Sequence, residues 1–147
     1  MTSINPIKSL GDSTKRRGFL FLIASLMASG CLNNKDTIYP LNRVIVSNDT
    51  DSDVSAEISF RKDGEPVDEL ETEIPAREDT VIKKEWMGDA VNYDITVSLA
   101  QNGKKSVSTS DLSERYNLQE DDCIAVDFEV NPNNEIETFL TGESCDN

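Results

Sequence analysis

Side chains between Val54 and Arg61 alternate strictly between apolar and polar. The apolar set is Val54, Ala56, Ile58 and Phe60, and the polar set is Ser55, Glu57, Ser59 and Arg61. A period of two places the apolar side chains on one face of an extended strand, whereas a helix requires a period of 3.6. The same alternation recurs in Asn92–Leu99 and Ile124–Val130. The chain must therefore bury one face of several strands. This alternation argues against disorder, although the chain is strongly acidic.

Five shorter segments add weaker strand signals, which brings the expected total to about seven or eight. They are Val44–Val46, Leu70–Ile74, Thr80–Glu85, Lys105–Thr109 and Ile136–Leu140. The single candidate for a helical turn is Asp111–Tyr116. Many short strands at spacings of roughly 8–12 residues indicate an all-β domain, either a small antiparallel β-sandwich or a small barrel.

Turn residues separate these segments. Asp63-Gly64 and Asn102-Gly103 each lie between two strand segments, and such pairs tolerate the positive φ that tight hairpins require. Both pairs predict antiparallel neighbours. Asn131–Asn134 contains Pro132, which cannot donate to a central ladder, so this run is expected to separate the last two strands.

The first thirty residues have the composition of an export signal. Lys8, Lys15, Arg16 and Arg17 precede an apolar run from Phe19 to Met27, which has the length of a signal core and is too short to span a bilayer. The order Arg16-Arg17-Gly18-Phe19-Leu20 is similar to a twin-arginine signal, which is read by a receptor and is no anchor. Paired arginines also occur in ordinary signals, so general secretion is the alternative.

A cysteine follows this apolar run directly. Ala28-Ser29-Gly30-Cys31 is similar to a lipobox, in which the cysteine thiol receives a lipid before cleavage, although the position three before the cysteine is usually a larger aliphatic residue. The alternative is a buried cysteine at the end of an apolar helix. The polar residues from Asn33 to Asp36 argue against that burial. We therefore predict a signal peptide at 1–30, a lipidated tether at 31–40 and a domain at 41–147.

The expected mature part is strongly acidic. Residues 31–147 contain 27 acidic and 10 basic side chains, a net charge of −17. Such a surface repels nucleic acid phosphates and anionic lipid head groups. The composition therefore excludes a nucleic-acid-binding function.

Two cysteines remain if Cys31 carries lipid. An even number suits one disulfide in an oxidising compartment. If the chain reverses at Asn131–Asn134 so that Val130 faces Glu135, Cys123 faces Gly142 and lies near Cys145. We predict a bridge between Cys123 and Cys145; two unrelated free cysteines are the alternative.

Several segments resemble small immunoglobulin-like lipoproteins of halophilic archaea. They are Val44–Val54, Ile74–Ala76 and the strand from Tyr93 to Leu99. The resemblance covers nearly the whole chain through loose motifs. It implies an immunoglobulin-like sandwich, twin-arginine export and an acidic surface that stays hydrated in molar salt. It implies no biochemical activity.

The sequence contains little evidence of a catalytic site or of a cofactor-binding site. The chain has no histidine, so the usual general base and the commonest transition-metal ligand are missing. Carboxylate pairs occur at every spacing on so acidic a chain, and none stands out. We expect no enzyme activity and no cofactor.

Three further features have a functional and a structural interpretation each. Asp49, Asp51 and Asp53 could offer oxygen ligands to calcium, but an EF-hand loop would need glycine in place of Val54 and glutamate in place of Phe60, so a solvated turn is the alternative. Asn48-Asp49-Thr50 is a candidate N-glycosylation sequon at Asn48. Trp86 is expected to anchor a loop or the core rather than to form a ligand platform.

The favoured function is a lipid-anchored, extracytoplasmic, non-catalytic module. It would be held at the membrane through Cys31 as a monomeric domain, with an unknown envelope or extracellular protein as partner. One alternative is an accessory or solute-binding subunit of a membrane system, which needs a concave site of about 300 Å³ or more. The other is an enzyme that works with carboxylates and without histidine, which needs two converging carboxylates in a cleft.

Overall fold

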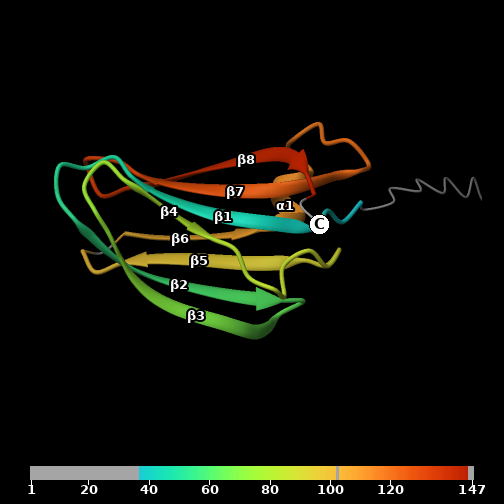
Figure 1. Cartoon of the computed structure of the whole chain (residues 1–147), viewed down its shortest axis with the longest axis horizontal. Coiled ribbons are helices and arrows are strands. Elements are labelled where there is room, and N and C mark those ends of the chain that lie inside the picture. The colour runs from blue at the N-terminus through green and yellow to red at the C-terminus, as the bar shows by residue number, and fades with distance from the viewer. Residues whose placement is uncertain (1–36, 102, 146–147) are drawn as a thin grey trace, which may run out of the picture. The chain divides into compact units, whose positions relative to one another are not determined.

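The computed structural model describes residues 37–101 and 103–145. They form eight strands and one short helix (Figure 1). The elements are β1 (Leu41–Asn48), β2 (Val54–Lys62), β3 (Glu65–Ile74), β4 (Asp79–Ile82), β5 (Tyr93–Leu99), β6 (Lys104–Ser108), α1 (Thr109–Ser113), β7 (Asp122–Val130) and β8 (Ile136–Ser144). The predicted signal peptide and most of the predicted tether lie outside the described residues. The helix begins two residues before the predicted turn.

The strands form two sheets that pack face to face. Sheet A has the order β4-β1-β7-β8 and sheet B the order β3-β2-β5-β6 (Figure 1). All pairs are antiparallel except β1 with β7, which is parallel. The predicted all-β sandwich is therefore confirmed, and the barrel alternative is not observed.

The connectivity differs from that of an immunoglobulin constant domain. There the sheets hold four and three strands, and the second and third strands lie in different sheets. Here both sheets have four strands, and β2 and β3 form a hairpin within sheet B. The likeness to immunoglobulin domains therefore extends to the two-sheet architecture and not to the strand order.

Alternating apolar side chains from both sheets fill the space between them. In sheet B the register places Ile58 opposite Val97 and Phe60 opposite Ile95. In sheet A it places Val44 opposite Val126 and Val46 opposite Phe128. All eight side chains are at most 1% exposed. The period of two seen in the sequence thus defines the inner faces, because successive side chains of a strand point to opposite sides.

The hairpin turns follow the predicted chemistry. Asp63 and Gly64 join β2 to β3 with φ values of 48° and 84°. Positive φ at both central positions matches the twist of the strands, and aspartate and glycine tolerate it. The predicted antiparallel pairing of β5 with β6 is also present.

The turn between β7 and β8 is one residue longer than predicted. Val130 pairs with Ile136 instead of Glu135, so Cys123 pairs with Glu143 instead of Gly142. The side-chain oxygen of Asn131 accepts hydrogen bonds from the backbone N–H groups of Asn133 and Glu135. These bonds stabilise a five-residue turn, which shifts the register by one position.

Both ends of the described domain lie at the same end of the sandwich (Figure 1). β1 starts beside the start of β7, where the N–H of Ile124 donates to the carbonyl of Pro40, and β8 ends opposite Asp122. The loops that follow β1, β3, β5 and β7 therefore lie at the opposite end. A tether attached before Leu41 would leave those loops facing away from its attachment point.

Candidate functional site

The outer face of sheet A carries a row of four side chains, three apolar and one acidic, that crosses all four strands. In register, Val81 of β4 faces Ile45 of β1, Ile45 faces Asp127 of β7, and Asp127 faces Phe139 of β8. We call these four residues the central row. Val81 is 58% exposed and Phe139 is 43% exposed. Two of the large hydrophobic side chains that reach solvent thus lie on one line across one face.

Asp127 is half-buried within this row. One of its carboxylate oxygens accepts a hydrogen bond from Ser47 Oγ at 3.1 Å. Burial raises the pKa of Asp127, and the nearby Asp79 raises it further, while the hydrogen bond from Ser47 acts in the opposite direction. No lysine or arginine among the described residues lies close enough to lower it. The central row therefore contains a carboxylate whose charge is poorly compensated.

The two flanking rows of this face differ in charge. On the side toward the loops after β1 and β3, register places Asp79, Glu129 and Glu137 on neighbouring strands beside Ser47. We call these three acids the acidic margin. On the other side lies Arg43, whose guanidinium binds Glu143 at 2.6 Å. Arg43 is thus engaged, and the acidic margin borders the central row on the opposite side.

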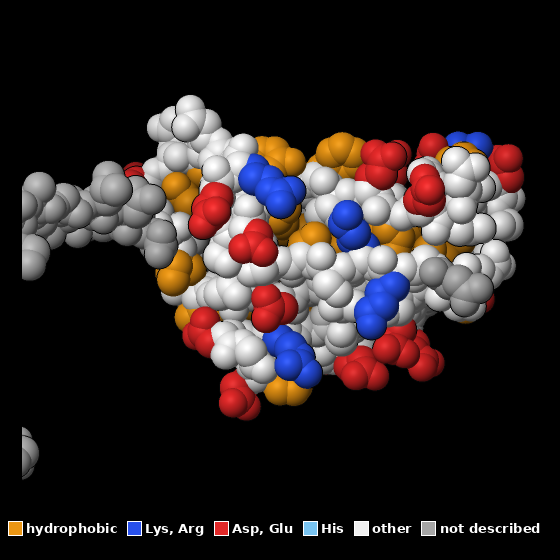
Figure 2. Space-filling view, turned by 180° about the vertical axis from the view of Figure 1, so that it is seen from behind, with side chains coloured by type: hydrophobic (Ala, Val, Ile, Leu, Met, Phe, Trp, Pro, Cys, Tyr) orange, Lys and Arg blue, Asp and Glu red, His pale blue; other side chains and the backbone are white. Residues whose placement is uncertain are grey.

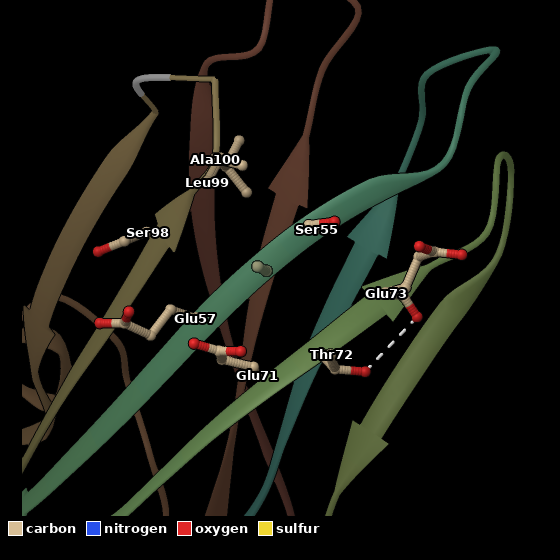
Figure 3. Close-up of a pocket in the computed structure, with 9 residues that line it drawn as sticks. Ser55, Glu57, Glu71, Thr72, Glu73, Ser98, Leu99 and Ala100 are labelled. Atoms are coloured by element: carbon tan, nitrogen blue, oxygen red, sulfur yellow. Dashed lines mark hydrogen bonds between the residues drawn. The ribbon is translucent and has the colours of Figure 1, made fainter.

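The outer face of sheet B is hollowed at the ends of β2, β3 and β5 (Figure 3). The hollow has a volume of about 490 Å³ and is lined mainly by Ser55, Glu57, Glu71, Glu73 and Ser98. Glu57 and Glu71 lie directly opposite each other in register. Ala56, Leu99 and Ala100 also line the hollow, so its surface combines carboxylates and hydroxyls with apolar side chains. Acidic side chains also lie among basic ones over the side of the domain seen in Figure 2.

Asn48, the candidate glycosylation residue, is 2% exposed at the end of β1. Its Nδ2 atom donates to the carbonyls of Ser52, Ile74 and Pro75 at 2.8, 2.9 and 3.1 Å. Its Oδ1 atom accepts from the backbone N–H and the hydroxyl of Thr50. A glycan would have to be attached to Nδ2, so this placement does not fit the predicted glycosylation of the folded domain. Asn48 therefore has a structural role, which the sequon pattern does not reveal.

The three aspartates proposed as calcium ligands have partners of their own. The guanidinium of Arg77 binds both Asp49 and Asp51, and the carboxylate of Asp53 accepts a hydrogen bond from the N–H of Ala76 at 3.0 Å. These contacts link the loop after β1 to the loop after β3. Within residues 37–101 and 103–145, no group of three or more metal-ligating side chains is arranged to hold a metal ion.

The structure joins Cys123 and Cys145 in a disulfide that spans 22 residues, with a Cα–Cα distance of 4.9 Å. It ties the residue after β8 to the start of β7. Glu143, opposite Cys123, also accepts a hydrogen bond from Asn42 at 2.6 Å, so the same end of β8 is held to β1.

The predicted export and lipidation residues lie outside the described residues: Arg16, Arg17, Phe19, Leu20 and Cys31.

Trp86 anchors the segment between β4 and β5, as predicted. Its ring packs edge-on against Phe60 with centroids 5.1 Å apart, and against Tyr93 at 5.9 Å. The hydroxyl of Tyr93 donates to the carbonyl of Trp86 at 3.1 Å.

In the described part of the chain, no helix has both the length and the apolar character needed to cross a bilayer.

The central row was not predicted from the sequence. Ile45 and Phe139 belong to predicted strands, but their alignment with Val81 and Asp127 depends on the pairing of four strands. One sequence signal was present: Val44-Ile45-Val46 is continuously apolar, which is typical of a strand with both faces covered.

Comparisons with known proteins assign the chain to no family. No family model matches it, and no curated protein matches it. A solved structure, described as the NMR structure of the protein from Eubacterium rectale, aligns with 80% of this chain and 100% of its own at 15% identity and a TM-score of 0.39. A similarity at this level assigns neither fold nor function.

Proposed function

We propose that this protein is a lipid-anchored, extracytoplasmic, non-catalytic module that binds a protein partner through the outer face of sheet A. The leader supports the location, because Arg16-Arg17, the apolar run and Cys31 follow in the order that export and lipidation require. The resemblance to halophilic lipoproteins and the net charge of −17 in residues 31–147 support a protein adapted to molar salt.

The exposed central row is the observation that carries the binding role. Single apolar side chains on a surface are ordinary, but a contiguous apolar patch with a polar rim marks interaction sites. Here apolar side chains from three strands flank Asp127, and the acidic margin borders the row on one side. A rigid sheet is a suitable support for such a surface because its backbone is held by ladder hydrogen bonds on both sides of β1 and β7.

An anchor at Cys31 would attach the domain at the end where β1 begins. The tether would leave the domain before Leu41, so the loops after β1, β3, β5 and β7 would point away from the membrane. The outer face of sheet A would then stand along the side of the anchored domain and remain accessible to a neighbouring protein.

A solute-binding accessory subunit is the second candidate, because the hollow on sheet B exceeds the expected minimum of about 300 Å³. Its lining of Glu57, Glu71 and Glu73 would favour a polyamine or another cationic solute over an anionic one. Titration calorimetry with spermidine tests this candidate: saturable heat that is lost in Glu71→Gln would favour it over the protein-binding role.

Fractionation of producing cells tests the proposed location. The wild-type chain should partition with the membrane and be digested by protease added to intact cells. Cys31→Ser should abolish the lipid and release the exported domain from the membrane, whereas Arg16→Lys with Arg17→Lys should retain it in the cytoplasm. A wild-type chain found in the cytoplasm would contradict the proposal.

A further inference from the structure

We propose that the central row of sheet A docks a protein segment in which a lysine or arginine lies between apolar side chains, with the cation paired to Asp127. This inference rests on the binding role proposed above and names the chemistry of the partner. Val81, Ile45 and Phe139 supply the apolar contacts, and Asp127 supplies the anion between them.

The shape of the row suits an extended segment. Its four residues lie on four adjacent strands, and strands are about 4.8 Å apart, so the row spans roughly 15 Å. An extended chain of about five residues covers that length. Such a segment can place apolar side chains over Ile45 and Phe139 and a basic one over Asp127, which lies between them in the register.

The charge of Asp127 has no evident role in the fold. Its side chain points away from the core formed by Val126 and Phe128, and its hydrogen bond with Ser47 would be available to an uncharged asparagine as well. A half-buried carboxylate without a cation is unfavourable, because burial penalises its charged form. A partner's lysine or arginine would compensate that charge as the interface excludes water, which is how paired charges give interfaces their specificity.

A second copy of this chain is a poor occupant of the face. A twofold axis parallel to the strands would place the acidic margin of one copy on that of the other. A twofold axis across the strands would place Asp127 opposite Asp127. Both arrangements bring like charges together, which costs free energy at an interface. Anionic lipid is disfavoured for the same reason.

Photo-crosslinking in producing cells tests this inference with the full chain. Phe139 is replaced by benzoylphenylalanine, which keeps an aromatic ring at an exposed position. Tyr116 is the matched control, since it is 40% exposed against 43% for Phe139 and lies between α1 and β7, in neither sheet. The crosslinked product is identified by mass spectrometry of the joined peptides.

The expected result is a protein adduct from position 139 and none from position 116. The joined peptide should contain lysine or arginine flanked by apolar residues. Asp127→Asn in the same chain should lower the adduct yield at least about tenfold, because it removes one member of a desolvated charge pair. Glu69→Gln, an equal change of charge on sheet B and outside the hollow, should leave the yield unchanged.

Four results would overturn the inference: no adduct at 139, an adduct with lipid or with a second copy, a partner peptide without lysine or arginine, and a yield that Asp127→Asn leaves unchanged. The same cells are fractionated in parallel. A chain at the membrane surface that forms no adduct refutes the docking inference alone, whereas a chain retained in the cytoplasm refutes the proposed function.

Discussion

The Nδ2 atom of Asn48 lies 2.9 Å from the carbonyl oxygen of Ile74, and this hydrogen bond joins the last residue of β1 in sheet A to the last residue of β3 in sheet B. The same nitrogen donates to Ser52 and Pro75, so one buried amide fixes two loops and both sheets. Asn48 thus continues the buried alternation of Val44 and Val46 with a polar side chain whose hydrogen bonds are satisfied.

We expect Asn48→Ala to destabilise the domain by about 2–4 kcal/mol, because it removes several buried hydrogen bonds and takes away the acceptor of the buried N–H of Thr50. Asn48→Asp should be at least as harmful, since a carboxylate would face three carbonyl oxygens without a donor. Urea unfolding of both variants measures the effect. Asn133→Ala at an exposed turn position is the control and should stay within about 0.5 kcal/mol. A wild-type stability in Asn48→Ala would show that the buried network is not important.

The pKa of Asp127 is raised by burial, so the folded domain binds a proton there more readily than the unfolded chain. Its ionisation therefore opposes folding: the penalty is absent below the ordinary value of 3.8 and develops as pH rises above it. Asp127→Asn should match the wild type near pH 3 and be the more stable protein near pH 7. Urea midpoints at both pH values measure this difference, and a less stable variant at pH 7 would contradict it.

Asp68 provides a comparison of opposite sign. A hydrogen bond from Lys84 lowers the pKa of Asp68, with an N–O distance of 3.1 Å. Its ionisation therefore stabilises the fold above pH 3.8, and this contribution is lost as pH falls. Asp68→Asn should lose stability near pH 7 and show little difference near pH 3. Equal pH profiles for the two asparagine variants would be inconsistent with the described environments.

Removing the disulfide should weaken the end of β8 without abolishing the fold. Cys145→Ser opens a loop of 22 residues, which corresponds to roughly 3 kcal/mol through the unfolded state. Glu143 would still hold β8 to Asn42 and Arg43. The variant and the reduced wild type should unfold at the same denaturant concentration. If reductant leaves the wild-type midpoint unchanged, the bridge has no stabilising role.

Salt should stabilise the domain, because its acidic side chains repel one another. The Debye length shortens from about 30 Å at 0.01 M to about 3 Å at 1 M. Glu57 and Glu71 are directly opposed, so Glu71→Gln should gain roughly 0.2–1 kcal/mol at low salt and less at 1 M. Glu114→Gln, beyond α1 and outside the strands, is the control. Unfolding midpoints that remain flat or fall between 0.1 and 2 M KCl would argue against the halophilic interpretation.

Local patterns in the sequence were sufficient to predict the strands and their inner faces. Alternation from Val54 to Arg61 and the Asp63-Gly64 turn are determined by neighbouring residues, so β2 and its hairpin with β3 could be predicted. The parallel pairing of β1 with β7 could not, because residues about eighty positions apart determine it. The same limit applies to the central row, whose members meet only through the pairing of four strands. The burial of Asn48 could not be predicted either, because the sequon pattern contains no information on burial.

The mass of the mature N-terminus distinguishes a processed, lipid-anchored protein from an unprocessed one. Protein extracted from the membranes of producing cells is digested, and the N-terminal peptide is identified by mass spectrometry. We expect a peptide that begins at Cys31 and carries a thioether-linked lipid, with residues 1–30 removed. A protein in the aqueous fraction that begins at Met1 and has an unmodified Cys31 would contradict it.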